Sequence, residues 1–297
     1  MGAFLLPRDN SDVSVRRWVR SVLEAQGEGM LSNPRERASI ADWLMADLDP
    51  RSRLILEALE HRYDEGELTL LQDHLRQVCS GIPVQRVVGW TEFRGLRIGC
   101  SGDVLIPRPE TEEVVGWFLE GMAMVKGDEA KRVLDIGTGS GCMALALKAE
   151  NPSWDVVGVD VSEAALNQAK TNAIELGLDV TWVALDALDS ATVAALGRFD
   201  GIVSNPPYIP SSEVLEPHVQ DHEPALALFV PDNEPLRFYN AMVPLVTSCL
   251  VSGGCMVAEC HTEFTKEVAD CWKLEGAQVQ VLCDLQGAQR AVRLIRS

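Results

Sequence analysis

The sequence has no apolar run long enough to cross a membrane. The longest nearly unbroken apolar stretch covers residues 241–251, and Pro244, Thr247 and Ser248 interrupt it, whereas a transmembrane helix needs about 20 apolar residues. The initial segment MGAFLLPRDN has no basic region and too short an apolar core for a signal peptide, and it lacks the Ser or Thr of a myristoylation signal. We therefore expect no membrane partner.

Basic residues are scarce. The 297 residues include 26 Lys and Arg, only six of them Lys, against 44 Asp and Glu, so the formal net charge is −18. Nucleic-acid-binding proteins need a positive surface to displace counterions, so this composition lowers the odds of a nucleic-acid partner. An acidic surface suits a cationic small molecule or a basic patch on a protein partner.

The eight cysteines form no C-x-x-C pair. Cys255, Cys260 and His261 have residue types that bind metals, but a fourth ligand at a suitable spacing is missing. We therefore expect no metal site. The cysteines are typical of a reduced, cytoplasmic protein that uses them as small apolar side chains.

The composition, with 46% hydrophobic and 24% charged residues, is that of a globular protein, and the length suggests one or two domains. Residues 11–80 have apolar side chains at helical spacing, and Pro34 and Pro50 mark helix boundaries. The apolar stripes are Val15, Val19 and Val22; Ile55, Leu56 and Leu59; and Leu68, Leu71, Leu75 and Val78. The pattern predicts a bundle of four or five helices over residues 1–80.

Residues 81–110 have a different character. Short β-prone runs around glycines between residues 87 and 98 predict a β-hairpin in a linker between domains. Pro107-Arg108-Pro109 predicts a rigid, extended piece, because each proline biases its predecessor away from helix. Thr111 is expected to cap a helix that runs to about residue 126.

From residue 131 onward, short apolar runs alternate with helical stretches, among them residues 162–176 and 262–274. The expected strands cover residues 133–136, 155–159, 180–185, 199–204, 255–259, 279–283 and 291–295. This alternation predicts an α/β fold with a doubly wound parallel sheet over residues 111–297. The last two strands lie too close for a crossover helix, so we expect them to pair antiparallel.

A glycine-rich loop follows the first of these strands: Asp135, Ile136, then Gly137-Thr138-Gly139-Ser140-Gly141. The G-x-G-x-G spacing differs from the dinucleotide-binding G-x-G-x-x-G. A carboxylate at position 135 would repel a pyrophosphate but attract an ammonium group, while the following helix N-terminus suits a carboxylate. The amino-acid part of S-adenosylmethionine carries both charges, so this loop is a candidate binding site for that cofactor.

Two later strand ends carry further candidates. Asp160 ends the second strand, where a carboxylate can accept hydrogen bonds from ribose hydroxyls, although it could also serve as a helix cap. Asp186 follows the third strand, where it could reach an adenine amino group or be an ordinary turn residue, and Ala187 would lie against the adenine ring.

Asn205-Pro206-Pro207-Tyr208 follows the fourth strand, and the carboxyl ends of such strands line the binding crevice of doubly wound sheets. Two prolines fix a rigid loop. The Asn205 side-chain oxygen and the Pro206 carbonyl can together hold both hydrogens of a planar NH2 group and direct its lone pair at a methyl donor. Tyr208 would pack on the substrate group. The four residues are therefore the candidate catalytic residues.

These two motifs together resemble those of class I, seven-stranded S-adenosylmethionine-dependent amino-methyltransferases. More specifically, the chain resembles the HemK/PrmC family. The segments that carry this resemblance are IPVQRVVG at residues 82–89, LIPRPETE at 105–112, NPPY at 205–208 and EPALAL at 223–228.

The resemblance covers about residues 80–297. It implies a Rossmann-like seven-stranded sheet, with the last strand antiparallel, preceded by a small helical domain at residues 1–80 that contacts the substrate protein. It also implies methyl transfer from S-adenosylmethionine to the side-chain amide nitrogen of the glutamine in the Gly-Gly-Gln motif of peptide-chain release factors, with S-adenosylhomocysteine as the product. We expect a monomer.

The sequence departs from the family pattern at Arg86, at residues 229–234 and at Glu259-Cys260-His261. Two other functions stay open. An N6-adenine methyltransferase acting on DNA or RNA would use the same tetrapeptide, with Tyr208 stacked on a flipped base. The third is a catalytically idle scaffold that only binds S-adenosylmethionine.

Overall fold

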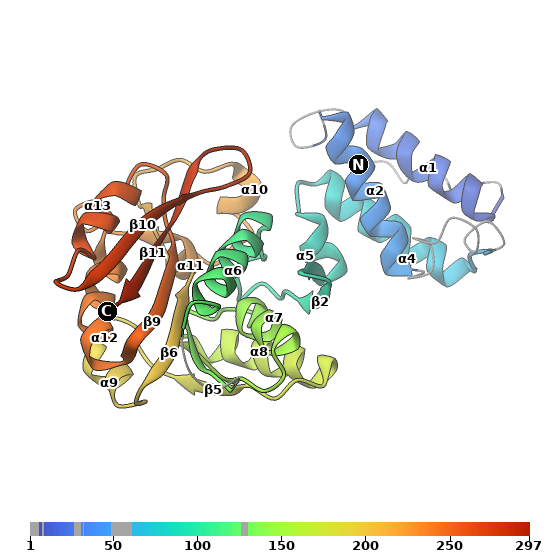
Figure 1. Ribbon diagram of the computed structural model, residues 1–297. Helices are drawn as coiled ribbons and strands as arrows, with labels where there is room; N and C mark the ends of the chain where they lie inside the picture. Colours follow the sequence, from blue (N-terminus) through green and yellow to red (C-terminus); the bar gives the residue numbers. More distant parts are fainter. Residues whose placement is uncertain (1–5, 8, 27–30, 32, 49–60, 126–129) are drawn as a thin grey trace. The chain divides into compact units, whose positions relative to one another are not determined.

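A computed structural model of the chain describes residues 6–7, 9–26, 31, 33–48, 61–125 and 130–297. The chain forms two compact units (Figure 1). The first comprises Met1–Trp90 together with Glu216–His222, and the second comprises Thr91–Leu215 together with Glu223–Ser297. The chain therefore leaves the second unit at residue 216 and re-enters it at residue 223.

The first unit is helical. Its described helices are α1 (Asp12–Ala25), α2 (Pro34–Leu48), α4 (Glu65–Cys79), α5 (Val84–Val88) and α10 (Pro217–Gln220). The predicted apolar stripes of α1 and α4 are buried in one core, and α2 begins at Pro34 as predicted. The predicted stripe at Ile55, Leu56 and Leu59 and the boundary at Pro50 lie outside the described residues.

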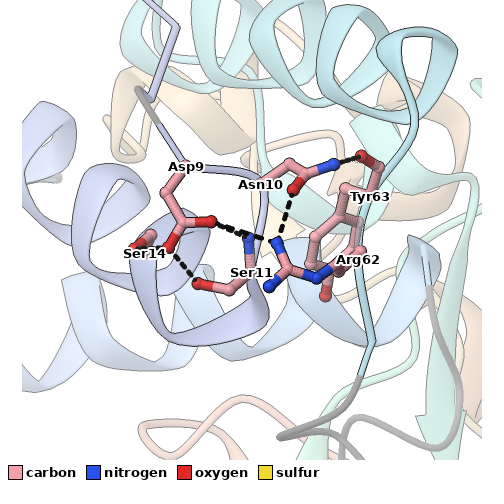
Figure 2. Close-up of polar contacts among 6 residues, drawn as sticks. All are labelled: Asp9, Asn10, Ser11, Ser14, Arg62 and Tyr63. Carbon is pink, nitrogen blue, oxygen red and sulfur yellow. Dashed lines mark hydrogen bonds and ion pairs between the residues drawn. The ribbon is translucent and has the colours of Figure 1, made fainter.

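Figure 2 shows how the segment before α1 is tied to the segment before α4. The Asn10 amide nitrogen donates to the Tyr63 carbonyl at 2.9 Å, and the Arg62 guanidinium donates to Asn10 at 3.1 Å and to Asp9 at 3.4 Å. The buried Tyr63 hydroxyl donates to Asp12 at 2.9 Å. These partners are 51–53 positions apart in the sequence, so the contacts connect the beginning of the helical unit to the segment that precedes α4.

The predicted β-hairpin is formed by β1 (Trp90–Phe93) and β2 (Leu96–Gly99), but it begins later than expected. Val87 and Val88 belong to α5 and pack against the helical core. A short apolar run by itself does not distinguish a strand from a buried helical turn. The turn at Arg94-Gly95 has positive φ at both positions, 47° and 77°, as the commonest two-residue hairpin turn requires.

Helix α6 (Pro109–Met122) also begins differently from the prediction. Arg108, not Thr111, occupies the N-cap position, and Pro109 is the first helical residue, where its fixed φ and missing N–H carry no penalty. Thr111 therefore lies inside the first turn, and it is only 2% exposed. The helix ends at Met122, before the predicted end near residue 126.

A seven-stranded sheet forms the centre of the second unit, in the order β10-β11-β9-β6-β3-β4-β5. The strands are β3 (Arg132–Ile136), β4 (Asp155–Asp160), β5 (Thr181–Ala184), β6 (Phe199–Ser204), β9 (Leu250–Glu259), β10 (Ala277–Cys283) and β11 (Gln289–Arg296). All seven overlap the predicted strands. The last strand, β11, pairs antiparallel with both β9 and β10, which confirms the predicted fold class.

Helices cover both faces of this sheet. Residues alternate along each strand, so that Val133 and Val203 face the core under α6, α7 (Cys142–Glu150) and α8 (Glu163–Leu176). Leu134 and Ile202 face the core under α9 (Ser190–Ala194), α12 (Arg237–Ser248) and α13 (Thr265–Cys271). Figure 1 shows the two groups of helices on opposite sides of the sheet. Burial on both faces explains why the strands are apolar throughout.

The segment after β6 contains two short parallel strands, β7 (Ile209–Pro210) and β8 (Phe229–Val230), and the short helix α11 (Ala225–Leu228). Helix α13 is shorter at both ends than the predicted helix over residues 262–274. Within the described ranges, no helix combines the length and the apolar content that a membrane span needs.

Candidate active site

A cavity of about 470 Å³ lies at the carboxyl ends of β3, β4, β5 and β6. Because these strands are parallel neighbours, the loops that follow them meet at one edge of the sheet. The predicted site residues that line the cavity are Gly137, Thr138, Gly139, Ser140, Asp160, Asp186, Ala187, Asn205 and Pro207. Among the described residues, Asp135, Gly141, Pro206 and Tyr208 lie outside the lining. The contacts of all these residues with a ligand remain predictions.

The glycines of the loop after β3 have different surroundings. Gly139 has a φ of +56°, and a Cβ atom added to it would meet nothing within 4 Å. Gly141, the N-cap of α7, has a φ of +80°, and an added Cβ atom would lie 2.8 Å from the Trp182 ring. Gly139 therefore leaves room for a ligand, whereas Gly141 is needed for packing within the protein.

Asp135 is fully buried at the end of β3. One carboxylate oxygen accepts hydrogen bonds from the Thr138 hydroxyl at 2.6 Å and from the Ala144 N–H at 3.2 Å. The other, Oδ1, has no hydrogen-bond partner among the described residues. Burial raises the pKa of Asp135 to about 7, against the opposing effect of these two hydrogen bonds. The side chain thus joins the glycine-rich loop to the first turn of α7.

Asp160 ends β4 and lines the cavity. It accepts hydrogen bonds from the Gly139 N–H and from the Ser162 N–H, both at 2.9 Å, and burial raises its pKa. The N-cap of α8 is Ser162, whose hydroxyl accepts from the Ala165 N–H. Asp160 is therefore not the helix cap; it lines the cavity, and its carboxylate holds the glycine-rich loop.

Asp186 forms an ordinary turn as well as lining the cavity. Its Oδ1 atom accepts a hydrogen bond from the Leu188 N–H at 2.9 Å, which is the two-residue pattern of an Asx turn. Its side chain is exposed. The turn is therefore confirmed, and contact with an adenine amino group stays a prediction.

The Asn205 side chain is connected to a buried group of polar residues. Its Nδ2 atom donates to the Thr111 hydroxyl oxygen at 3.1 Å, and that hydroxyl donates to Glu259 Oε2 at 2.8 Å. The Tyr208 hydroxyl donates to Glu259 Oε1 at 3.1 Å. Burial, followed by the charge of Glu259, raises the pKa of Tyr208 well above its ordinary value, so its hydroxyl stays protonated.

Two residues outside the lining, Arg108 and Glu223, join two segments that line the cavity, and the sequence reasoning gave neither a role of its own. Glu223 has a nearly fully buried carboxylate, which pairs with the Arg108 guanidinium and accepts the Ile106 N–H at 3.0 Å. This pair joins the segment 105–109 to the segment 223–228, and both contribute to the lining through Leu105, Pro107, Pro224 and Leu226. The signal was present, since both segments carry the family resemblance.

Four of the cysteines are buried: Cys100, Cys249, Cys255 and Cys260. Burial raises the pKa of Cys255 to about 12 and that of Cys260 to about 12, so neither is a thiolate near neutral pH. Across the described ranges, no group of three or more His, Cys, Asp or Glu side chains is arranged to hold a metal ion.

Known proteins are similar to this chain over most of its length. The family model of the Methyltransferase small domain matches residues 118–221. A release factor glutamine methyltransferase of Flavobacterium psychrophilum is 37% identical over 70% of this chain and 73% of its own. Among solved structures, the delta-N METTL16 MTase domain is 17% identical, with a TM-score of 0.49 over 76% of this chain and 97% of that one.

The similarity extends to nearly full length in one relative. A release factor glutamine methyltransferase of Bacillus subtilis is 34% identical over 93% of this chain and 94% of its own. The matched region includes the glycine-rich loop, the tetrapeptide at 205–208 and most of the helical unit, because only a few per cent of the chain lies outside it. The chain therefore belongs to the family of release factor glutamine methyltransferases.

Proposed function

We propose that this chain transfers a methyl group from S-adenosylmethionine to the side-chain amide nitrogen of the glutamine in the Gly-Gly-Gln motif of peptide-chain release factors. The observation that carries the proposal is the Asn205 carboxamide, which lies at the cavity. Its nitrogen donates to Thr111, and its oxygen accepts no hydrogen bond from any residue that the structure describes. Relatives that match most of this chain are named release factor glutamine methyltransferases, and this supports the same function.

The cavity fits S-adenosylmethionine in size and in chemistry. Its volume of about 470 Å³ is within the range of roughly 300–1,000 Å³ for small-molecule sites. The open space at Gly139 would admit the amino-acid part, the Asp160 carboxylate would accept the ribose hydroxyls, and Asp186 with Ala187 would face the adenine. When bound, the sulfonium of this cofactor supplies an activated methyl group and leaves as a neutral thioether.

The protein's task is to present an unreactive nitrogen. The lone pair of an amide is delocalised into its carbonyl, so the nitrogen is a poor nucleophile. Two acceptors, the Asn205 side-chain oxygen and the Pro206 carbonyl, would hold both N–H groups and aim the lone pair at the methyl carbon. Positioning of this kind lowers a barrier by roughly 7–11 kcal/mol at best. The nitrogen becomes acidic as the new bond forms, so no strong base is needed.

A methyl-transfer assay tests the proposal. Tritiated S-adenosylmethionine is incubated with the enzyme and either a release factor, the same factor with its Gly-Gly-Gln glutamine replaced by alanine, or unmethylated DNA. Label on the intact factor alone is the expected result. Label on DNA and none on the factor would instead identify the adenine methyltransferase, which the net charge of −18 and the names of the relatives do not favour.

We also propose that residues 1–80 recognise the release factor, that residues 81–110 act as the linker and that residues 111–297 carry out the methyl transfer. The helical unit has its own core, built from α1, α2, α4 and α5. A compact unit of this kind, separate from the cavity residues, suits a role in protein recognition.

A further inference from the structure

A buried chain of hydrogen bonds stands behind the cavity. It runs from Asn205 Nδ2 to the Thr111 hydroxyl (3.1 Å), from that hydroxyl to Glu259 (2.8 Å) and, on the other carboxylate oxygen, from the Tyr208 hydroxyl to Glu259 (3.1 Å). Thr111 and Glu259 are each 2% exposed. The Glu259 carboxylate thus contacts Tyr208, the last residue of the tetrapeptide, directly, and Asn205, the first, through Thr111.

The fold brings these residues together from distant parts of the sequence. Strands β6 and β9 are parallel neighbours with Ser204 opposite Ala258, so Asn205 and Glu259 follow at the same edge of the sheet. The first turn of α6 brings in Thr111, which also lines the cavity. Glu259 is followed by Cys260 and His261, where the run departs from the family pattern, and the proposed transfer step does not otherwise use Glu259.

The donors and acceptors in this chain of hydrogen bonds fix the orientation of the Asn205 amide. A carboxylate can only accept hydrogen bonds, so both Thr111 and Tyr208 must donate to Glu259. The structure has both hydroxyls donating to this carboxyl group. Burial raises the pKa of Glu259, and these two hydrogen bonds and the charge of Arg290 oppose that rise. With its one proton used, the Thr111 hydroxyl can only accept from Asn205. The Asn205 nitrogen therefore faces Thr111, and its oxygen lies on the opposite branch of the planar amide.

We propose that Thr111 and Glu259 are positioning residues that hold the Asn205 carboxamide with its oxygen available to the N–H of the substrate amide. This inference rests on the proposed function and deepens it. If the amide were reversed, its NH2 group would face the NH2 group of the substrate, donor against donor. One of the two acceptors that hold the nucleophile would be lost.

The test compares Thr111→Val, which keeps the shape but removes the hydroxyl, with Thr111→Ser, which restores it. Thr265→Val is the matched control, because Thr265 is an equally buried threonine in α13 that donates to Gln289 outside the cavity. For each variant we would measure kcat and KM with release factor, and cofactor affinity by calorimetry. Glu259→Gln is a second variant in case Thr111→Val does not fold, since an amide at this position no longer fixes the direction of the bonds.

We expect kcat of Thr111→Val to fall about 10- to 100-fold, as for a misplaced reacting group. We expect Thr111→Ser to recover most of this loss, and Thr265→Val and all cofactor affinities to stay within about twofold of wild type. A purely structural role predicts instead that serine is as poor as valine. That result, or kcat within about twofold of wild type in both Thr111→Val and Glu259→Gln, would overturn the proposal.

A second measurement needs neither substrate nor cofactor. In ¹⁵N-labelled protein, the Asn205 side-chain NH2 signal is identified by its loss in Asn205→Ala. Its hydrogen exchange with water should be slow in wild type and Thr111→Ser, and faster in Thr111→Val. Equal hydrogen exchange of the Asn205 NH2 group in wild type and both Thr111 variants would contradict the hydrogen bond from Asn205 to Thr111. If the wild-type enzyme transfers no label to any release factor, the proposed function fails. The hydrogen-exchange measurement still decides whether the hydrogen bond from Asn205 to Thr111 exists.

Discussion

At Asn205, the side-chain nitrogen donates to Thr111, and we propose that the oxygen accepts from the substrate amide. We expect Asn205→Ala to lower methyl transfer by more than about 100-fold. The amide nitrogen of the substrate glutamine would lose one of its two acceptors and its alignment with the methyl carbon. Cofactor affinity, measured by calorimetry, should change little. Near-normal turnover in this variant would refute the assigned role of Asn205.

Asp160 has a second task besides facing the cavity, since it also accepts the Gly139 N–H. We expect Asp160→Ala to weaken S-adenosylmethionine binding by roughly 10- to 150-fold, the equivalent of one lost charge-assisted hydrogen bond of about 1.5–3 kcal/mol. Asp189→Ala is the control, because Asp189 also accepts backbone N–H groups, in α9, but does not line the cavity. An unchanged dissociation constant for Asp160→Ala would contradict the ribose assignment.

The buried carboxyl of Asp135 makes stability depend on pH. Its folded-state pKa of about 7 lies above the ordinary value of 3.8, so between pH 4 and 7 the folded protein keeps a proton that the unfolded chain releases. The free energy of unfolding should therefore fall as pH rises through this window, by about 1.4 kcal/mol per pH unit for one proton.

Asp135→Asn isolates this contribution, because asparagine does not ionise. We expect the variant to gain stability relative to wild type as the pH is raised from 4.5 to 7, in urea unfolding without ligand. Its carboxamide oxygen can still accept from Thr138 and Ala144. A stability difference that stays constant over this range would show that Asp135 is ionised throughout.

At the scale of elements, the tight junction between β3 and α7 depends on Gly141. We expect Gly141→Ala to destabilise the protein more than Gly177→Ala. Both glycines have positive φ, which costs an alanine about 1–2 kcal/mol. Only at Gly141 would the new Cβ overlap the Trp182 ring, which adds about 1–3 kcal/mol for overpacking. Chemical unfolding of both variants measures the difference, and equal losses would contradict the packing argument.

Elements buried on both faces were the most predictable. The apolar runs at residues 133–136 and 199–204 are strands because helices cover both sides of them. The equally apolar Val87 and Val88 became part of α5, since their partners are in the helical core rather than in a sheet. Likewise, Pro109 and not Thr111 set the start of α6. Local patterns do not reveal which partner buries an apolar residue.

At the scale of the whole molecule, the boundary of the helical unit lies at Trp90, and residues 216–222 belong to that unit as well. The Arg86 guanidinium donates to the His222 carbonyl at 3.1 Å, and this hydrogen bond helps to hold residues 216–222 in the helical unit. We expect a chain that begins at Thr91 to bind S-adenosylmethionine with an affinity within about threefold of wild type, but to lose most of its kcat/KM for release factor.

A chain that begins at residue 81 serves as a comparison for this truncation. It keeps Val84, Val87 and Val88 without the core that buries them, and should be less soluble. Full activity of the chain that begins at Thr91, toward release factor, would assign the helical unit a different role.

The sequence by itself determined the seven strands, the antiparallel last strand and the nine predicted site residues that line the cavity. These features follow from local apolar patterns and from motifs in which strand, loop and helix are contiguous. Only the tertiary structure decided that Thr111 and Glu259 stand behind Asn205, that Asp135 is sealed beneath the loop and that residues 216–222 return to the helical unit. The contacts of Thr111 with Asn205 and with Glu259 join residues 94 and 148 positions apart. Their geometry depends on how separate elements pack, which no local pattern encodes.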